Sequence, residues 1–495
     1  MVLPPATSSL FSIAFGSCNS NTITDIWSTI QSTKPDRLVL LGDTVYADRR
    51  NTLVGYAKAV VLHGQLNGSF LPGTAEDIKK QYALLTGRQS FQDLITQVGW
   101  DNVSATFDDH DYGINNGNRY YAHKAAAQHL FWDFVGVPAS DQTTRSQSGV
   151  YSSKRFTVPL PGPWGALRSL VGKIVMLDIR SNRDPTEAGA AGDFLGEEQW
   201  RWLETELLGD GNGDGNGDGN DGYVDLVVLG SSIPVLADDK LVEESWSMFP
   251  VARRRLLRLI AAAAAPNLVI VSGDVHYSEL SQAWCTPEPR AVARPLYEFT
   301  SSGLSHTAWM STHVYRSEAA RMPGVVAKRG VARTLFGWYQ ATFASRFREQ
   351  RFAHMYAGPN FGLLTVKSDA ADAAEPLQGT CDGGDTATCP SPTSAAAVTL
   401  SLSFQILDHD GQPAISKTIP LHPRGAAGGS TGGTDVNCEP FWGPQPWYRD
   451  VLFRSFLCVF CIGPLLAAVL AAVLAPAALL VAGGVYLCRR APTPK

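Results

Sequence analysis

The chain has 495 residues, of which 44% are hydrophobic and 18% charged. These proportions exclude a chain that is disordered throughout, and the length allows about three domains or one large α/β domain. Lys and Arg number 41 and Asp and Glu 46, a formal net charge of −5, which excludes a general nucleic-acid-binding scaffold. Eight cysteines are too few for a disulfide-stabilised small domain.

Short apolar runs that end in glycine or polar residues recur along the chain and predict buried strands. They are Ser12–Phe15, Arg37–Leu41, Val103–Phe107, Lys173–Leu177, Val224–Leu229 and Asn267–Val271. Between them, Glu197–Leu208 and Arg253–Ala265 carry apolar residues at helical spacing. The alternation of strands and helices predicts a layered α/β fold.

The pattern changes at Val398–Ile406, where every second residue is apolar, as in a half-buried antiparallel strand. Asp410 and Gly411 predict a turn into a second strand. We expect a second sheet to end in this hairpin and the soluble domain to occupy residues 1–422.

Low-complexity segments interrupt and follow this domain. Residues 209–222 read GDGNGDGNGDGNDG, which fits either a Ca²⁺-wrapping loop or a solvated flexible loop, although no Glu stands at the twelfth position of an EF-hand pattern. Residues 368–397 predict a surface loop, and residues 423–454 a linker and juxtamembrane segment.

Residues 455–488 contain no charged side chain and are long enough for one transmembrane helix. The interpretation is a single-pass protein with a C-terminal anchor, followed by a short basic tail over 489–495. Basic residues flank the span on both sides, so its orientation stays open. No usable signal peptide precedes the first predicted strand, so either the body is cytosolic or the true start lies upstream. Cys381 and Cys389 are compatible with a disulfide in an oxidising compartment and with reduced thiols in the cytosol.

Polar side chains follow five of the predicted strands at once. The segments are Gly16-Ser17-Cys18-Asn19, Gly42-Asp43-Thr44-Val45-Tyr46, Asp108-Asp109-His110-Asp111, Asp178-Ile179-Arg180 and Ser272-Gly273-Asp274-Val275-His276. In open α/β sheets ligands gather at the carboxyl ends of strands. Several carboxylates that converge there would repel one another unless cations lay between them, so the pattern indicates a metal centre suited to hydrolysis. The absence of a GxxxxGK[ST] loop and of a GxSxG elbow argues against nucleotide-driven transfer and a serine hydrolase.

The ordered set FGSC, LLGDTVYAD, FDDHDYGINN, LDIRSNRD, LGEEQWRWLE, LVIVSGDVHYSEL and YEFTSSGLSH resembles the alkaline phosphatase D (PhoD-like) family of calcineurin-like metallophosphatases. The resemblance runs from about Phe11 to Val366. It implies a four-layer αββα sandwich with a dinuclear metal site on its rim, and the hydrolysis of phosphomonoesters, phosphodiesters or both by attack of a metal-bound hydroxide.

The resemblance also implies roles for single residues. The implied metal ligands are Cys18, Asp43, Tyr46, Asp109, Asn115, Asp274 and His276. His110 would protonate the leaving group, Asp111 would orient the His110 ring, and Arg180 would hold a phosphate oxygen. Iron with calcium is the first expectation for the metals, and manganese or zinc are the alternatives. Gly230-Ser231-Ser232 stands where many metallophosphatases have a histidine ligand.

The sequence and this resemblance together predict a membrane-anchored, metal-dependent phosphoesterase that acts on a phosphate-ester small molecule or a lipid head group. The alternative is a catalytically silent relative that serves as a membrane receptor or scaffold.

Overall fold

The structure is a computed structural model of the chain. It describes residues 7–20, 25–52, 70–164, 167–208, 224–238, 240, 244–263, 265–287, 294–307, 346–350, 353–369, 398–423 and 436–440. The chain divides into a unit over residues 1–442 and a second over 443–495. The repeat at 209–222, Cys381, Cys389, the segment 424–435 and the apolar stretch 455–488 lie outside the described residues. Among the residues that are described, no helix is long and apolar enough to cross a membrane.

The first sheet has six strands in the order β15-β14-β13-β1-β2-β5. Its parallel strands are β1 (Thr7–Gly16), β2 (Arg37–Leu41) and β5 (Val103–Thr106). Its antiparallel strands are β13 (Asn360–Asp369), β14 (Thr399–Asp408) and β15 (Pro413–Pro420). The expected hairpin is therefore β14–β15, but its sheet differs from the prediction: β13 pairs with β1 and joins the hairpin to the first strands of the chain.

The second sheet has eight strands, with the order β12-β10-β11-β9-β8-β7-β6 and β16 paired to β10. The strands are β6 (Ser152–Trp164), β7 (Leu167–Met176), β8 (Leu226–Ser231), β9 (Asn267–Ser272), β10 (Ser278–Pro287), β11 (Arg294–Thr300), β12 (Met355–Tyr356) and β16 (Val436–Pro440). Strands β7, β8, β9 and β11 run parallel. A disulfide joins Cys285 of β10 to Cys438 of β16.

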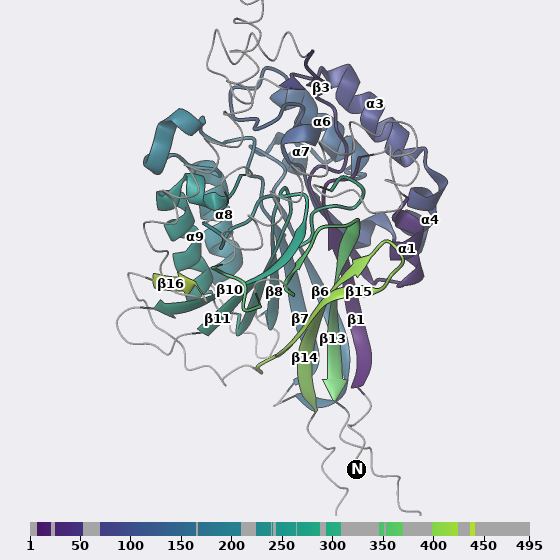
Figure 1. Cartoon of the computed structure of the whole chain (residues 1–495), viewed down its shortest axis with the longest axis vertical. Helices are drawn as coiled ribbons and strands as arrows, with labels where there is room; N and C mark the ends of the chain where they lie inside the picture. The colour runs from purple at the N-terminus through teal and green to yellow at the C-terminus, as the bar shows by residue number, and fades with distance from the viewer. Residues whose placement is uncertain are drawn as a thin grey trace, which may run out of the picture. The chain divides into compact units, whose positions relative to one another are not determined.

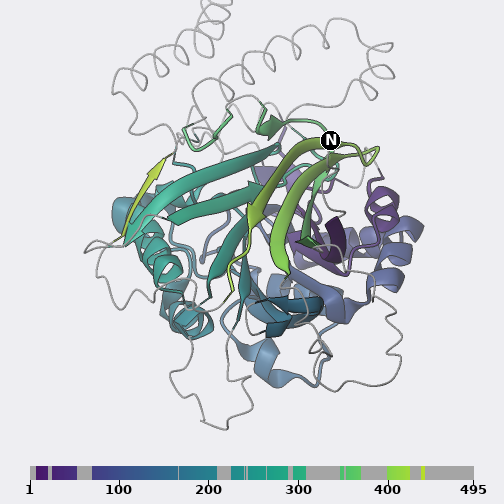
Figure 2. The same cartoon turned by 90° about the horizontal axis from the view of Figure 1, so that it is seen from below.

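The helices lie on the outer faces of the two sheets, as Figures 1 and 2 show. Those of the first half are α1 (Trp27–Ser32), α3 (Ala75–Thr86), α4 (Gln89–Val98), α5 (Asp109–Tyr112), α6 (Lys124–Phe134) and α7 (Gln142–Ser146). Those that follow β7 are α8 (Gly196–Leu208) and α9 (Pro250–Ala262). A small hairpin, β3 (Arg49–Arg50) with β4 (Phe70–Leu71), lies apart from both sheets.

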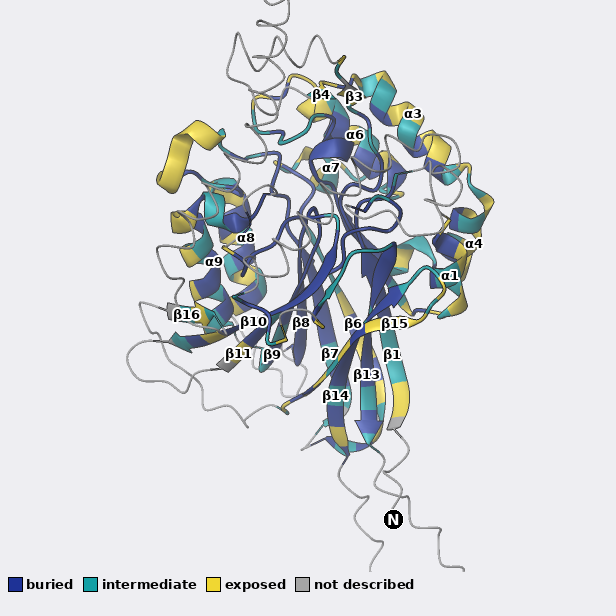
Figure 3. Cartoon of the chain, viewed as in Figure 1, coloured by how far each residue is buried: buried dark blue, intermediate teal, exposed yellow. Residues whose placement is uncertain are grey.

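Three apolar cores hold these layers together. The inner faces of the two sheets share one core, in which Phe299 of β11 stacks on Phe404 of β14 at 4.1 Å between ring centroids. A second core packs helices α1, α3, α4 and α6 against β2 and β5, and a third packs α8 and α9 against β7 and β8. The central strands are accordingly buried, while the helices expose their outer faces (Figure 3). This mixed α/β sandwich places the carboxyl ends of parallel strands from both sheets near one rim.

Candidate metal centre

Four of the seven predicted ligand positions share an uncommon backbone conformation. Cys18, Asp43, Asp274 and His276 have φ angles of 62°, 49°, 70° and 59°, in the left-handed region that non-glycine residues rarely adopt. Each follows a strand by two to four residues. Such conformations cost on the order of 1–3 kcal/mol each and cluster at functional sites.

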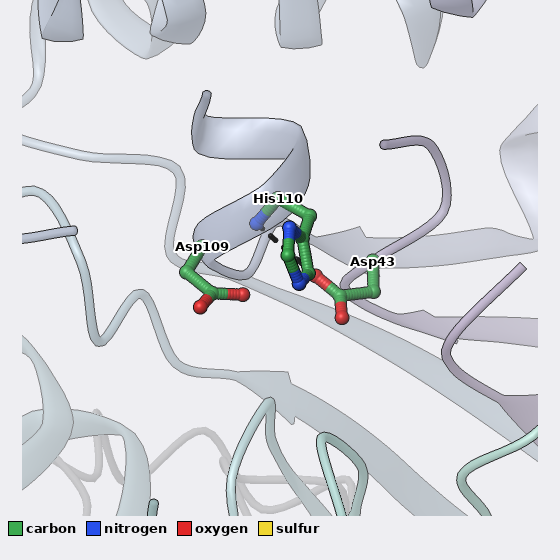
Figure 4. Close-up of side chains that lie close together, drawn as sticks. All are labelled: Asp43, Asp109 and His110. Atoms are coloured by element: carbon green, nitrogen blue, oxygen red, sulfur yellow. Dashed lines mark hydrogen bonds between the residues drawn. The ribbon is translucent and has the colours of Figure 1, made fainter. Parts of the chain in front are cut away.

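The carboxylates of Asp43 and Asp109 and the imidazole of His110 form one group of donors, each offering an atom within 4.8 Å of the others (Figure 4). All three residues are buried. The backbone N–H of His110 donates to Asp43 Oδ1 at 3.2 Å, and the backbone N–H of Asn116 donates to Asp109 Oδ2 at 2.7 Å. These bonds fix the two carboxylates, because each is held by the chain that follows β5.

A second group joins Asp108, Asp109 and Asp274, again within 4.8 Å of one another. Asp109 thus belongs to both groups. Within the described part of the chain, Asp108 Oδ2 and Asp109 Oδ1 are buried without a hydrogen-bond partner. Buried carboxylate oxygens without donors are costly unless a cation lies against them, so this donor set fits a pair of metal ions.

The pKa values reflect this crowding. Burial raises the pKa of Asp43 well above its usual range and that of Asp108 to about 6. For Asp109, burial acts in the same direction, but attraction to His110 and Arg180 outweighs it and lowers the pKa to about 2. The Asp109 carboxyl is therefore held in its anionic form, which suits a metal ligand.

Cys18 and Tyr46 lie on the far side of Asp43. Cys18 Sγ is 3.6 Å from Asp43 Oδ2, and the Tyr46 hydroxyl donates to the same oxygen at 3.2 Å. Burial raises the pKa of the Cys18 thiol to about 11, so only a bound cation would hold it as a thiolate at neutral pH. Sulfur and phenol oxygen are thus available beside the first group, and the sulfur also lies 3.8 Å from the carbonyl oxygen of Asp274.

His276 and Asn115 lie at the edge of these groups. The His276 ring packs on the ring of His306 at 4.4 Å between centroids, and its backbone N–H donates to Ser302 Oγ at 2.7 Å. The backbone N–H of Asn115 is directed at Asp48 and lowers the pKa of that carboxyl, which burial raises. The contacts of the described residues place neither side chain within the two groups of carboxylates, so the ligand roles of His276 and Asn115 stay predictions.

The partner of His110 differs from the prediction. His110 Nδ1 lies 2.8 Å from Oδ2 of Asp48, whose side chain is 1% exposed. Asp111 instead caps helix α5, since it accepts the backbone N–H of Asp108 at 2.5 Å and that of Thr44 at 3.2 Å. Successive residues of a helix point apart, so Asp111 does not orient its neighbour's ring.

The guanidinium of Arg180 is fully buried and pairs with Asp108 through Nε and with Glu244 through Nη1. Glu244 in turn pairs with Arg183, which donates to the carbonyl of Asn116 at 3.0 Å. Among the described residues, Arg180 Nη2 has no hydrogen-bond partner. Arg180 therefore supports Asp108 through Nε, and its contact with a phosphate oxygen stays a prediction.

The serine segment after β8 takes part in the same support. Ser232 Oγ donates to Asp108 Oδ1 at 2.8 Å, at the position where many metallophosphatases have a histidine ligand. Sequence reasoning missed Asp48, Asp108 and Ser302. Asp108 carried the same strand-end signal as Asp109, whereas Asp48 and Ser302 reach the site through loops whose paths the sequence pattern does not reveal.

The family model of PhoD-like phosphatases matches residues 13–334. No curated protein matches the chain. A solved structure of PhoD matches with 16% sequence identity and a TM-score of 0.44, over 86% of this chain and 74% of that chain.

Proposed function

The chain belongs to the PhoD-like phosphatase family, and we propose that it is a metal-dependent phosphoesterase that hydrolyses phosphomonoesters, phosphodiesters or both. The observation that carries the proposal is the position of Asp109, whose carboxylate lies within 4.8 Å of a carboxylate oxygen of Asp43 and also of those of Asp108 and Asp274. Side chains from three separate strand ends thus converge on one place, as a two-metal hydrolase requires.

The two donor groups favour different ions. Cys18 and Tyr46 add sulfur and phenol oxygen beside Asp43, a set that suits iron or another transition metal. Asp108, Asp109 and Asp274 offer only carboxylate oxygens, which suit a hard cation such as Ca²⁺ or Mn²⁺. We therefore propose iron with calcium, with manganese or zinc as alternatives.

Two such ions, when bound, acidify water and neutralise the charge of phosphate oxygens. The chain itself supplies the proton for the leaving group through His110. Burial lowers the pKa of this imidazole, but the surrounding carboxylates of Asp109, Asp43 and Asp48 outweigh burial and raise it to about 10. Asp48 holds Nδ1, so the proton on Nε2 is the one available to the leaving oxygen.

The natural substrate is proposed at the level of its class, a phosphate-ester small molecule or a lipid head group. We propose that residues 455–488 anchor the protein in a membrane as a single-pass helix, because this stretch holds no charged side chain. A lipid head group would then lie in the same membrane as the anchor, whereas a soluble ester would reach the site by diffusion.

The disulfide between Cys285 and Cys438 bears on the compartment in which the catalytic domain lies. Disulfides persist in oxidising compartments and are rare in the cytosol. We propose that the catalytic body faces an oxidising compartment. Protease protection in intact vesicles, combined with thiol alkylation before and after reduction, tests this; a body exposed to the cytosol with Cys285 free to alkylate would contradict it.

The activity test uses the full chain, loaded in turn with iron and calcium, manganese, or zinc, and a panel of aryl and alkyl phosphomonoesters and phosphodiesters. We expect turnover that Asp43→Asn and Asp274→Asn each reduce by more than about 100-fold, because even outer-shell partners of metal ligands are worth 10- to 100-fold. Circular dichroism verifies that the variants fold. A wild-type protein with both ions bound and no turnover on any ester would favour the silent receptor or scaffold instead.

A further inference from the structure

The hydroxyl of Ser302 lies between two of the predicted ligand residues. Its Oγ accepts the backbone N–H of His276 at 2.7 Å and lies 3.1 Å from Cys18 Sγ. Ser302 and Cys18 are both fully buried. Ser302 belongs to the segment that follows β11, so it joins three strand ends that are distant in sequence.

The direction of the bond to sulfur depends on the protonation of Cys18. Ser302 Oγ accepts the His276 N–H and keeps its own hydrogen for a second partner, and either Oγ or Sγ can donate in the contact between them. A thiolate carries no proton, so with Cys18 as a ligand the bond runs from Ser302 to sulfur. Ser17 Oγ lies farther from the sulfur, at 3.5 Å, and also donates to the carbonyl of Ser301 at 3.3 Å.

The backbone fixes Ser302 in this place. Ser17 and Ser302 form a parallel β-bridge, and Ser17 N–H donates to Ser301 O at 3.1 Å. Farther along, the N–H groups of Ser305 and His306 donate to the carbonyl of Cys18 at 3.2 and 2.9 Å. The loop after β11 is therefore attached by main-chain bonds on both sides of Ser302, and the hydroxyl needs no rearrangement to reach the sulfur.

We propose that Ser302 is a positioning residue that donates a hydrogen bond to the Cys18 thiolate and holds His276 in its left-handed conformation. The proposal rests on the proposed function, since it takes Cys18 as a metal ligand. A hydrogen bond draws electron density from a ligating sulfur and so tunes the electronic state of the metal. It also orients the ligand, as outer partners of metal sites do.

Cobalt(II) is the probe, because a thiolate–cobalt bond has a charge-transfer absorption band whichever metal the protein holds natively. In the full-length, cobalt-loaded protein we expect Cys18→Ser to abolish the band and so identify it. We expect Ser302→Ala to move the band to longer wavelength and to weaken cobalt binding by about 10- to 100-fold in chelator competition. Ser302→Thr keeps the hydroxyl, and its band should remain at the wild-type wavelength.

The matched control is Ser301→Ala. Ser301 is the adjacent residue, is equally buried, and donates to Asn360 Oδ1 at 2.9 Å instead of to sulfur. Its band and cobalt affinity should match the wild type. Ser302→Gly provides a second removal variant if the alanine variant does not fold.

A folded Ser302→Ala or Ser302→Gly variant with an unshifted thiolate band would overturn the proposal. A wild-type protein that binds cobalt but shows no thiolate band would overturn it too, by removing Cys18 from the ligand set. In that case the effect of Asp43→Asn on turnover separately decides whether the phosphoesterase proposal stands.

Discussion

Asp48 Oδ2 lies 2.8 Å from His110 Nδ1, and both side chains are almost fully buried. The two residues come from different strand ends. Asp48 lies in the segment after β2, and His110 is the second residue of helix α5, which follows β5. A buried carboxylate against an imidazole fixes the ring's orientation and favours its protonated form. Asp48 therefore orients the imidazole ring of His110, the proposed general acid, and favours its protonated form.

Asp48→Asn should remove one of the three charges that favour imidazolium, and the one that contacts Nδ1, while keeping the shape of the side chain. We expect kcat on alkyl phosphates, whose leaving groups need a proton, to fall by about 10²- to 10⁴-fold, the range of general acid catalysis. Aryl phosphates with acidic leaving groups should lose much less. The measurement is kcat against the pKa of the leaving group for both proteins.

Asp93→Asn is the matched control, because Asp93 is an exposed residue of α4 that accepts only from Gln89. It should follow the wild-type dependence on leaving-group pKa. An equal loss for alkyl and aryl esters in Asp48→Asn would mean that the pair serves the fold and not proton transfer.

The position of Asp109 in both donor groups predicts how metal is lost. Asp109→Asn should lower the bound metal by both ions, because both groups lose an oxygen. Cys18→Ser should lower the ion beside Asp43 more than the other ion, since the sulfur contacts the Asp43 carboxylate at 3.6 Å but only the backbone carbonyl of Asp274, at 3.8 Å. Elemental analysis of dialysed protein gives the metal-to-protein ratio. Full occupancy in Asp109→Asn would contradict the shared-ligand arrangement.

Metal removal should make stability depend on pH. In the metal-free protein burial raises the pKa of Asp108 to about 6 from 3.8. The folded state then binds more protons than the unfolded state between these values, so the free energy of unfolding decreases as pH rises from 4 to 6, by at most about 3 kcal/mol for a two-unit shift. Burial raises the pKa of Asp43 in the same direction.

Urea midpoints of chelated protein, taken by circular dichroism from pH 4 to 6.5, measure this effect. The loaded protein should be more stable than the chelated one, and the gap should narrow as pH falls, because protons then compete with the ions. A midpoint of the chelated protein that rises with pH would show that ionising these buried carboxyls does not destabilise the metal-free fold.

Gly362 of β13 should not tolerate a side chain. It pairs with Phe15 of β1, and a Cβ atom at position 362 would lie 2.1 Å from Cζ of the Phe15 ring. Gly362→Ala therefore overpacks the core between the sheets, and we expect a loss of about 1–3 kcal/mol in the free energy of unfolding. Gly87→Ala, at a helix end where the nearest atom to a new Cβ is the carbonyl oxygen of Ala83 at 3.1 Å, should cost less. Equal denaturation midpoints for the two variants would argue against the packing of Phe15 on β13.

Much of the parallel core could be predicted from the sequence, because strands buried on both faces read as continuous apolar runs. Arg37–Leu41 is β2 as predicted, and Asn267–Val271 differs from β9 by one residue. The long β6–β7 hairpin was only partly predicted: β6 is half exposed and contains prolines, so its apolar pattern is weak. Strand β13 was missed, although it joins the final hairpin to β1.

For the site, too, some parts could be predicted from the sequence and others could not. The strand-end rule predicted that Asp43, Asp109 and Asp274 lie close together, as they do, while their role as ligands stays a prediction. The contacts that support these side chains could not be predicted, because they depend on how loops fold back. Asp111 looked like a partner of His110 by adjacency, yet its spacing from Asp108 is that of a capping box. The pairing of Arg180 with Asp108 and Glu244 could not be read from the sequence, because Glu244 lies in a loop far along the chain.

The left-handed backbone at Asp43 and Asp274 has an evolutionary consequence. Glycine and asparagine adopt this conformation more readily than alanine or valine. A lineage that abandoned hydrolysis but kept the sandwich would therefore be expected to drift toward Gly or Asn at these two positions. Such replacements would identify catalytically inactive relatives, because Gly or Asn keeps the backbone conformation of the turn while the carboxylate is lost.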